Sequence, residues 1–315
     1  MANKFRKLNN LIIWNKNNSY IHNLFITAKE IKKNKYDIAI STYPSGAKEV
    51  MALYMSKAKI KNILKNKGGY FRFLQFLFSN APNANPDIHE IENNAILLNV
   101  PTEILRKNQI KFNINNGINI GIHIGSNGIH KRWELDNWIE LIKILKIKYD
   151  ANISLIAGNN ERELANIIEN NVDVSNILIG VSFEELISHI NRFTLLIGND
   201  SSIAHISAIY NIPTIVIWSY SQYRRISPYS SGTIVITHNY DCIPCYDVTK
   251  RYINKCKYNF RCIKNTKFDD IYNILDIYLS KLINHRIPDI SEFGNIETVE
   301  KTEILPWGTK VIYLK

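Results

Sequence analysis

The sequence predicts an α/β protein of two domains, with a doubly wound parallel sheet in the C-terminal one. From about residue 119 to residue 275, short apolar runs alternate with helical patterns. Strands that alternate with helices pair in parallel, and the helices cover both faces of the sheet. A polar stretch at 107–117 separates this region from a smaller α/β unit. With 315 residues, the chain is long enough for two medium-sized domains with their own cores.

The N-terminal domain is expected to span residues 1–110. A short apolar run within it suits a buried strand, and the prolines at positions 82 and 86 interrupt the helical patterns. The elements we expect are helices at 24–31, 48–55, 70–78 and 87–98 and a strand at 37–41.

The C-terminal domain is expected at 111–285, followed by a tail at 286–315 without a clear pattern. Its best helical signal runs from Trp138 to Leu145, where apolar residues recur at i, i+3, i+4 and i+7. The other elements we expect are strands at 119–124, 153–157, 177–179, 195–197 and 214–218 and helices at 161–168, 183–190, 203–210 and 269–282.

The formal net charge is +11, but the lysines are spread along the chain apart from a short run at 29–35. This pattern favours a solvated basic face over a groove for a polyanion, so we expect no nucleic acid partner. No apolar stretch approaches the length of a membrane span, and residues 1–14 lack the apolar core of a secretory signal. We therefore expect a cytoplasmic protein.

The four cysteines, Cys242, Cys245, Cys256 and Cys262, all lie in one short segment. In a reducing compartment such clustering favours free thiols or a metal site over disulfides. The first pair has the spacing of a zinc knuckle, and four thiolates could close a structural tetrahedral site. Reduced thiols without a metal are the alternative.

Polar residues follow three of the expected strands, where an open parallel sheet binds its ligands. After the first strand come Ser126 and Asn127 between glycines, and then Lys131 and Arg132. Either cation could neutralise a diphosphate, although a solvated loop would have the same composition. After the second strand comes Glu161, which could accept hydrogen bonds from ribose or sugar hydroxyls or could simply favour a helix start.

The third position is the most informative, because an apolar strand leads directly into a helix there. Asp200, Ser201 and Ser202 stand at the junction, and His205 lies one turn further on. The free N–H groups and the positive end of a helix make an anion site at such a junction. A lone cap or a lone histidine is usually structural, but three polar sites at neighbouring strand ends together indicate a binding pocket.

These residues resemble the signature of glycosyltransferase family 9, the heptosyltransferase family, over most of residues 89–275. The family transfers heptose from ADP-heptose to lipopolysaccharide core. The resemblance implies the GT-B fold of two Rossmann-like domains, here with a shortened N-terminal, acceptor-side domain. The matching residues are Lys131, Arg132, Trp133, Trp138, Gly158, Glu161, Asn199, Asp200, Ser201, Ser202 and His205.

By this resemblance, Lys131 would bind the donor's phosphates and Glu161 its hydroxyls. Asp200 would bind the sugar, while Ser201 and Ser202 would meet the diphosphate and His205 would support them. Ser126 and Asn127 are also expected to contact the donor. Lys131 and Asp200 are the expected catalytic residues, in an inverting reaction that needs no metal cofactor.

The sequence departs from the family in two places. The family opens with a strand, a Gly-Asp pair and a helix, and that Asp is the general base; no such opening is found here, so the base is unknown. The family also more often has Gly where this chain has Ser202. Part of the family carries a comparable cysteine-rich segment with a metal, so a structural zinc or iron could occupy the four cysteines.

The expected partners are a nucleotide-sugar donor such as ADP-heptose and a glycolipid or other glycan acceptor, with peripheral contact at the inner face of the cytoplasmic membrane. Two alternatives stay open. One is a catalytically weak homologue that binds nucleotide sugars. The other is a basic nucleic-acid-binding protein with a metal knuckle, which the charge and the cysteine spacing favour but no recognition motif accompanies.

Overall fold

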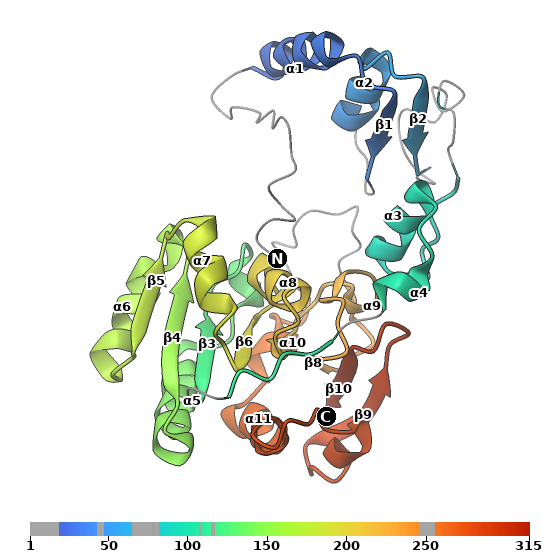
Figure 1. Cartoon of the computed structure of the whole chain (residues 1–315). Coiled ribbons are helices and arrows are strands. Elements are labelled where there is room, and N and C mark those ends of the chain that lie inside the picture. Colours follow the sequence, from blue (N-terminus) through green and yellow to red (C-terminus); the bar gives the residue numbers. More distant parts are fainter. Residues whose placement is uncertain are drawn as a thin grey trace. The chain divides into compact units, whose positions relative to one another are not determined.

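The computed structural model describes residues 19–42, 47–64, 78, 82–106, 109–114, 117–245 and 256–315. The chain divides into two compact units, Met1–Thr102 and Glu103–Lys315 (Figure 1). The helix expected at 70–78 lies outside the described residues, apart from its last position. Among the described residues, no helix is both long enough and apolar enough to cross a bilayer.

Unit 1 contains a two-stranded parallel sheet of β1 (Ile38–Ser41) and β2 (Ile60–Ile63). Helix α2 (Ala47–Met55) packs on this sheet, and α1 (Tyr20–Asn34) packs on α2 (Figure 1). Helix α1 begins where the hydroxyl of Ser19 accepts a hydrogen bond from the N–H of His22 over 3.2 Å. The sequence indicated both helices and β1, but β2 was missed because two of its four residues are polar. Helix α3 (Glu90–Leu98) completes this unit, and α4 (Thr102–Leu105) lies across the boundary.

Unit 2 is built on an eight-stranded sheet in the order β5-β4-β3-β6-β7-β8-β10-β9. All neighbouring strands pair in parallel except β9, which is antiparallel to β10. The predicted doubly wound parallel sheet is therefore confirmed. The strands are β3 (Asn119–His123), β4 (Asn152–Ala157), β5 (Asn176–Ile179), β6 (Leu195–Asn199), β7 (Thr214–Ile217), β8 (Thr233–His238), β9 (Val299–Ile304) and β10 (Lys310–Leu314).

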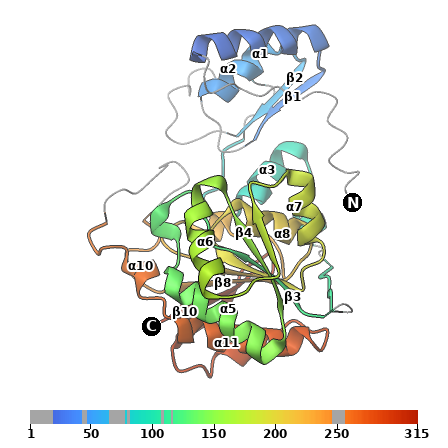
Figure 2. The same cartoon turned by 90° about the vertical axis from the view of Figure 1, so that its left-hand side faces the viewer.

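Two hydrophobic clusters pack on the opposite faces of this sheet. Strand residues alternate between them: Leu155 belongs to one cluster and Ile156 to the other, because successive side chains of a strand point to opposite faces. One cluster is covered by α5 (Leu135–Tyr149), α6 (Arg162–Asn171) and α11 (Phe268–Leu282), and the other by α7 (Phe183–Ile190) and α8 (Ser202–Ile209) (Figure 2). The short helical segments of this unit are α9 (Tyr223–Ile226), α10 (Arg261–Lys264) and the 3-10 helices at Ile129–Lys131, Asn159–Glu161 and Ile290–Phe293.

Residues 286–315, expected as a tail, instead supply the last two strands of the sheet. Strand β10 is fully buried between β8 and β9, so it is part of the core. Strand β9 forms the edge and carries charged side chains, which hid it from a search for apolar runs. Gly308, whose φ is +91°, makes the turn between the two strands.

Candidate functional site

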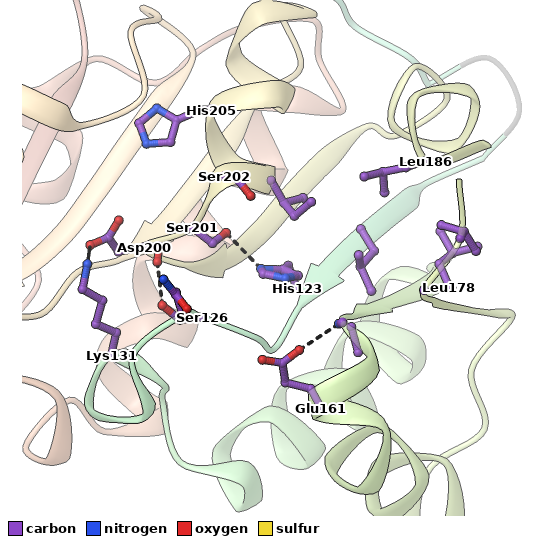
Figure 3. A pocket seen from close by; sticks show the side chains of 17 residues that line it. His123, Ser126, Lys131, Glu161, Leu178, Leu186, Asp200, Ser201, Ser202 and His205 are labelled. Atoms are coloured by element: carbon purple, nitrogen blue, oxygen red, sulfur yellow. Dashed lines mark hydrogen bonds and ion pairs between the residues drawn. The ribbon is translucent and has the colours of Figure 1, made fainter. Parts of the chain in front are cut away.

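A pocket of about 740 Å³ opens at the carboxyl ends of β3, β4 and β6 (Figure 3). Because parallel strands end at the same edge of the sheet, the loops that follow them meet there. All eight residues that the sequence assigned to a donor line this one pocket. They are Ser126, Asn127, Lys131, Glu161, Asp200, Ser201, Ser202 and His205.

The two residues predicted to be catalytic form an ion pair within the pocket. The ammonium of Lys131 lies 2.5 Å from Oδ2 of Asp200, and both side chains are largely buried. The same oxygen accepts a hydrogen bond from the hydroxyl of Ser221, which is completely buried. The hydroxyl of Ser126 donates to the backbone carbonyl of Asp200 over 2.8 Å. Side chain and backbone of Asp200 are thus held from two loops, the one after β3 and the one after β7.

The ring of Tyr220 lies beside this ion pair, with its centroid 5.4 Å from the Lys131 ammonium. A cation at this distance from an aromatic face is attracted by the ring's quadrupole. Tyr220 is itself buried and packs near Phe260. The loop after β7 therefore supports both members of the pair.

Glu161 is fixed by two contacts at its two carboxylate oxygens. Oε1 lies 2.6 Å from the guanidinium of Arg132, and Oε2 accepts the N–H of Gly158 over 2.9 Å. Arg132 also donates to the backbone carbonyl of Ser126 over 3.0 Å. Of the two interpretations of Glu161, the helix-start role is present in the structure, and the same carboxylate also lines the pocket.

The start of α8 is arranged so that its first N–H groups are not capped by the side chain before them. Ser201 is the N-cap residue, but its hydroxyl is 3.0 Å from Nδ1 of His123 and makes no capping hydrogen bond. First-turn N–H groups without a side-chain cap can bind an anion, and the helix dipole favours one. This geometry suits a phosphate group in the pocket.

Two histidines line this region of the pocket, His123, which is buried, and His205, which is half-buried. Burial, together with the nearby charge of Arg132, lowers the pKa of His123 to about 4. Burial also lowers the pKa of His205, and the charge of Lys131 acts in the same direction while Asp200 opposes it. Near neutral pH, His123 is therefore uncharged and can hold Ser201 through a neutral hydrogen bond.

Asn199, the last residue of β6, ties this strand to the loop after β3. Its amide donates to the carbonyl of Ile124 over 2.8 Å, and its Oδ1 accepts the N–H of Trp133 over 3.0 Å. The side chain is completely buried. These two bonds hold the segment that carries Lys131 against the strand that leads to Asp200.

Sequence reasoning missed His123 and Ser221 and considered Arg132 only as a phosphate ligand. His123 ends a strand that was read only for its apolar residues. Ser221 lies in a loop without a motif, and nothing in the sequence indicates that it meets Asp200. The single signal for Ser221 is its position after β7, which is the neighbour of β6 in the sheet.

The four cysteines are free thiols in the described structure. Cys262 is buried, and burial raises its pKa to about 12. The thiol of Cys245 donates to the carbonyl of Cys242, and its N–H donates to the carbonyl of Tyr220. Within the described residues, no three His, Cys, Asp or Glu side chains converge as metal ligands, and residues 246–255, which connect Cys245 to Cys256, lie outside the described residues. Metal binding by this segment stays a prediction.

The model of glycosyltransferase family 9 (heptosyltransferase) matches residues 25–255. Lipooligosaccharide heptosyltransferase 2 from each of two Campylobacter jejuni strains is 30% identical to the chain over 139 and 140 residues. The match covers 42% of this chain and 42% and 43% of these relatives, so it spans about two fifths of their length.

Solved structures of three proteins share the fold at low sequence identity. The Escherichia coli ADP-heptose LPS heptosyltransferase II is 16% identical, with 84% of this chain and 82% of that chain covered and a TM-score of 0.62. E. coli heptosyltransferase WaaC with ADP is 13% identical, with 88% of this chain and 81% of that chain covered and a TM-score of 0.62. The family 9 glycosyl transferase of Veillonella parvula DSM 2008 is 18% identical, with 84% of this chain and 79% of that chain covered and a TM-score of 0.64. The predicted GT-B fold is confirmed by these likenesses.

Proposed function

Because this chain belongs to glycosyltransferase family 9, the heptosyltransferase family, we propose that it transfers a sugar from a nucleotide-diphosphate donor to a surface glycan. The donor is ADP-heptose or a close analogue, and the acceptor is lipopolysaccharide core or a similar glycan. The transfer inverts the anomeric centre.

One observation supports this proposal above the others: the predicted donor residues, which lie up to 79 positions apart from Ser126 to His205, line a single pocket. The pocket offers a cation at Lys131, carboxylates at Glu161 and Asp200, and the uncapped start of α8. Diphosphate, ribose and sugar hydroxyls would find complementary groups there.

In the proposed reaction, an acceptor hydroxyl oxygen forms a bond to the anomeric carbon while the bond from that carbon to the diphosphate oxygen breaks. Negative charge then builds up on the departing nucleoside diphosphate. Lys131 and the N–H groups at the start of α8 would stabilise this charge, which is worth several kcal/mol in a site shielded from water, roughly 3–4 kcal/mol for one well-placed donor. Because these groups supply positive charge, we expect turnover without an added divalent metal.

The acceptor hydroxyl must lose its proton to a base. Both carboxylates of the pocket are already ion-paired, Asp200 with Lys131 and Glu161 with Arg132. We therefore assign the base to neither.

Contact with an anionic membrane surface is proposed for one face of α1. Phe25, Lys29 and Lys32 follow one another at i, i+4 and i+7, so they form one stripe along the helix. Phe25 is 71% exposed, and both lysines are exposed. An apolar ring flanked by ammonium groups suits the headgroup region of an anionic bilayer, where a glycolipid acceptor would lie.

Sedimentation with phosphatidylglycerol vesicles tests this contact. Wild-type protein should sediment with these vesicles and not with phosphatidylcholine vesicles, and salt should weaken the binding. The triple variant Phe25→Ala, Lys29→Glu, Lys32→Glu should lose it. The matched control Lys143→Glu, Ile147→Ala removes an exposed lysine and an exposed apolar side chain from α5 and should retain it. Equal loss in both variants would contradict the assignment to α1.

The transfer itself is tested by incubating the protein with ADP-heptose, GDP-mannose and UDP-glucose, each with extracted lipopolysaccharide core as acceptor. Release of nucleoside diphosphate from one donor, unchanged by a metal chelator, is the expected result. Binding of a donor without release would favour the catalytically weak homologue instead. Salt-sensitive binding to nucleic acid, with no affinity for any nucleotide sugar, would contradict the proposal.

A further inference from the structure

The loop that follows β7 places one serine hydroxyl against the carboxylate of Asp200. Ser221 is completely buried, and its Oγ donates a hydrogen bond to Oδ2 of Asp200. The two residues lie 21 positions apart and follow neighbouring strands, β6 and β7. Sequence motifs assign no role to this serine.

The backbone of Ser221 is itself held in place. Its carbonyl accepts the indole N–H of Trp218 over 2.9 Å and the N–H of Tyr223 over 3.0 Å. Trp218 is among the most buried side chains of the protein. Because the backbone is fixed from both sides, the hydroxyl has a defined direction toward Asp200.

The carboxylate of Asp200 is consequently held at one oxygen only. Oδ2 receives both the ammonium of Lys131 and the hydroxyl of Ser221, while no described residue donates to Oδ1. A carboxylate with two donors on one oxygen can rotate little about its last bond. Oδ1 is thus left to accept a hydrogen bond from a ligand hydroxyl in the pocket that Asp200 lines.

We propose that Ser221 is a positioning residue that fixes the Asp200 carboxylate for a hydroxyl of the donor's sugar. The inference rests on the proposed function, since it takes the pocket to hold a nucleotide sugar. Ser221 acts through Asp200 and does not touch the donor. Replacement of Ser221 should therefore weaken the binding of the sugar and not the binding of the nucleotide.

Titration calorimetry with ADP-heptose and with ADP tests this role. Ser221→Ala should weaken ADP-heptose binding roughly tenfold, the size expected for a lost hydrogen bond to a charged group, and should change ADP binding less than about twofold. Ser221→Thr keeps the hydroxyl and should restore most of the affinity. Ser219→Ala is the matched control: this serine is equally buried in the same loop, but its Oγ has no hydrogen-bond partner among the residues that the structure describes. It should bind both ligands like the wild type.

A double-mutant cycle separates positioning from a purely structural role. In an Asp200→Asn background, Ser221→Ala should have little further effect on ADP-heptose binding, because the carboxylate that Ser221 positions is gone. An equal loss in both backgrounds, or an equal loss for ADP and ADP-heptose, would overturn the inference. Should Ser221→Ala fail to fold, Ser221→Cys takes its place in the cycle.

Failure of the proposed function would look different. Wild-type protein would then bind neither ADP nor ADP-heptose, and the positioning role of Ser221 would be contradicted together with the proposed function. Binding of both ligands by the wild type, with Ser221→Ala unchanged toward each, would leave the donor pocket standing and contradict only the positioning role.

Discussion

The ammonium of Lys131 and the carboxylate of Asp200 meet at 2.5 Å in the pocket, although 69 positions separate them in the chain. Lys131 follows β3 and Asp200 follows β6, two strands that pair in parallel. Their side chains point toward one another in Figure 3. The pair therefore joins the two loops that are proposed to bind the phosphates and the sugar of the donor.

Removal of the charge on Lys131 should reduce sugar transfer strongly. Lys131→Met keeps the length of the side chain but removes the cation, so the departing diphosphate loses a stabilising group. We expect turnover to fall roughly 100- to 1,000-fold. Initial rates of nucleoside diphosphate release measure this. Lys143→Met, at an exposed position of α5, is the control and should turn over normally. A rate within twofold of the wild type for Lys131→Met would remove it from the mechanism.

Glu161 should contribute to the binding of the nucleoside and not to the binding of the phosphates. Glu161→Gln keeps an oxygen for the N–H of Gly158 but loses the charge that pairs with Arg132. We expect the dissociation constant of ADP to rise roughly tenfold, because charge-assisted bonds to the ribose hydroxyls are lost. Pyrophosphate, which has no ribose, should bind as before.

The control for this prediction is Glu163→Gln, an exposed carboxylate in the first turn of α6. It should leave the binding of both ligands unchanged. If Glu161→Gln weakened pyrophosphate as much as ADP, Glu161 would be a structural cap alone.

His123 should make the protein less stable in mild acid. Its pKa is lowered to about 4 in the folded protein, while the unfolded chain has a value near 6.5. The folded state thus keeps His123 neutral where the unfolded state binds a proton. The stability from this residue is complete above pH 6.5 and is lost as the pH falls toward 4, by roughly 2 kcal/mol at pH 5.

Urea unfolding at pH 7 and pH 5 measures this effect. Four of the five tryptophans, Trp133, Trp138, Trp218 and Trp307, are buried in unit 2, so fluorescence follows its unfolding. His123→Gln should lose about 2 kcal/mol less than the wild type between the two pH values. The same loss in both proteins would mean that His123 is protonated in the folded state.

The four thiols should differ in reactivity. Cys262 is buried with a pKa of about 12, so it holds almost no thiolate near neutral pH. In chelator-treated protein at pH 8, Ellman's reagent should modify Cys242, Cys245 and Cys256 first and Cys262 only on unfolding. Cys262→Ser should lack the slow phase. Four equally fast thiols would contradict the burial of Cys262.

Elemental analysis of the untreated protein tests the predicted structural zinc or iron. One metal ion per chain, absent from Cys242→Ser, would support the prediction. The prediction would be refuted if the wild type contained no metal and its unfolding curve were the same as that of Cys242→Ser.

The sequence was sufficient for those parts of the fold in which local pattern and tertiary packing agree. Helix α5 has one apolar stripe, and α7 begins at Ser182, whose hydroxyl accepts a hydrogen bond from the N–H of Glu185. It was not sufficient where strands are stabilised by their neighbours. Strand β9 carries three charged residues and exists because β10 pairs with it.

The residues of the pocket could likewise be predicted only in part. Lys131, Glu161 and Asp200 could be predicted because polar residues at successive strand ends of a parallel sheet converge. Their partners could not, because each partner comes from another loop: Arg132 reaches Glu161 over 29 positions, and Ser221 reaches Asp200 over 21. Such pairings depend on strand order, which the sequence alone does not specify.

A crystal structure with bound ADP would show which residues contact the nucleotide. We expect the diphosphate at the start of α8 within reach of Lys131, and the ribose beside Glu161. Nucleotide bound elsewhere on unit 2, with Lys131, Glu161 and Asp200 not in contact with it, would contradict the assignment of this pocket to the donor.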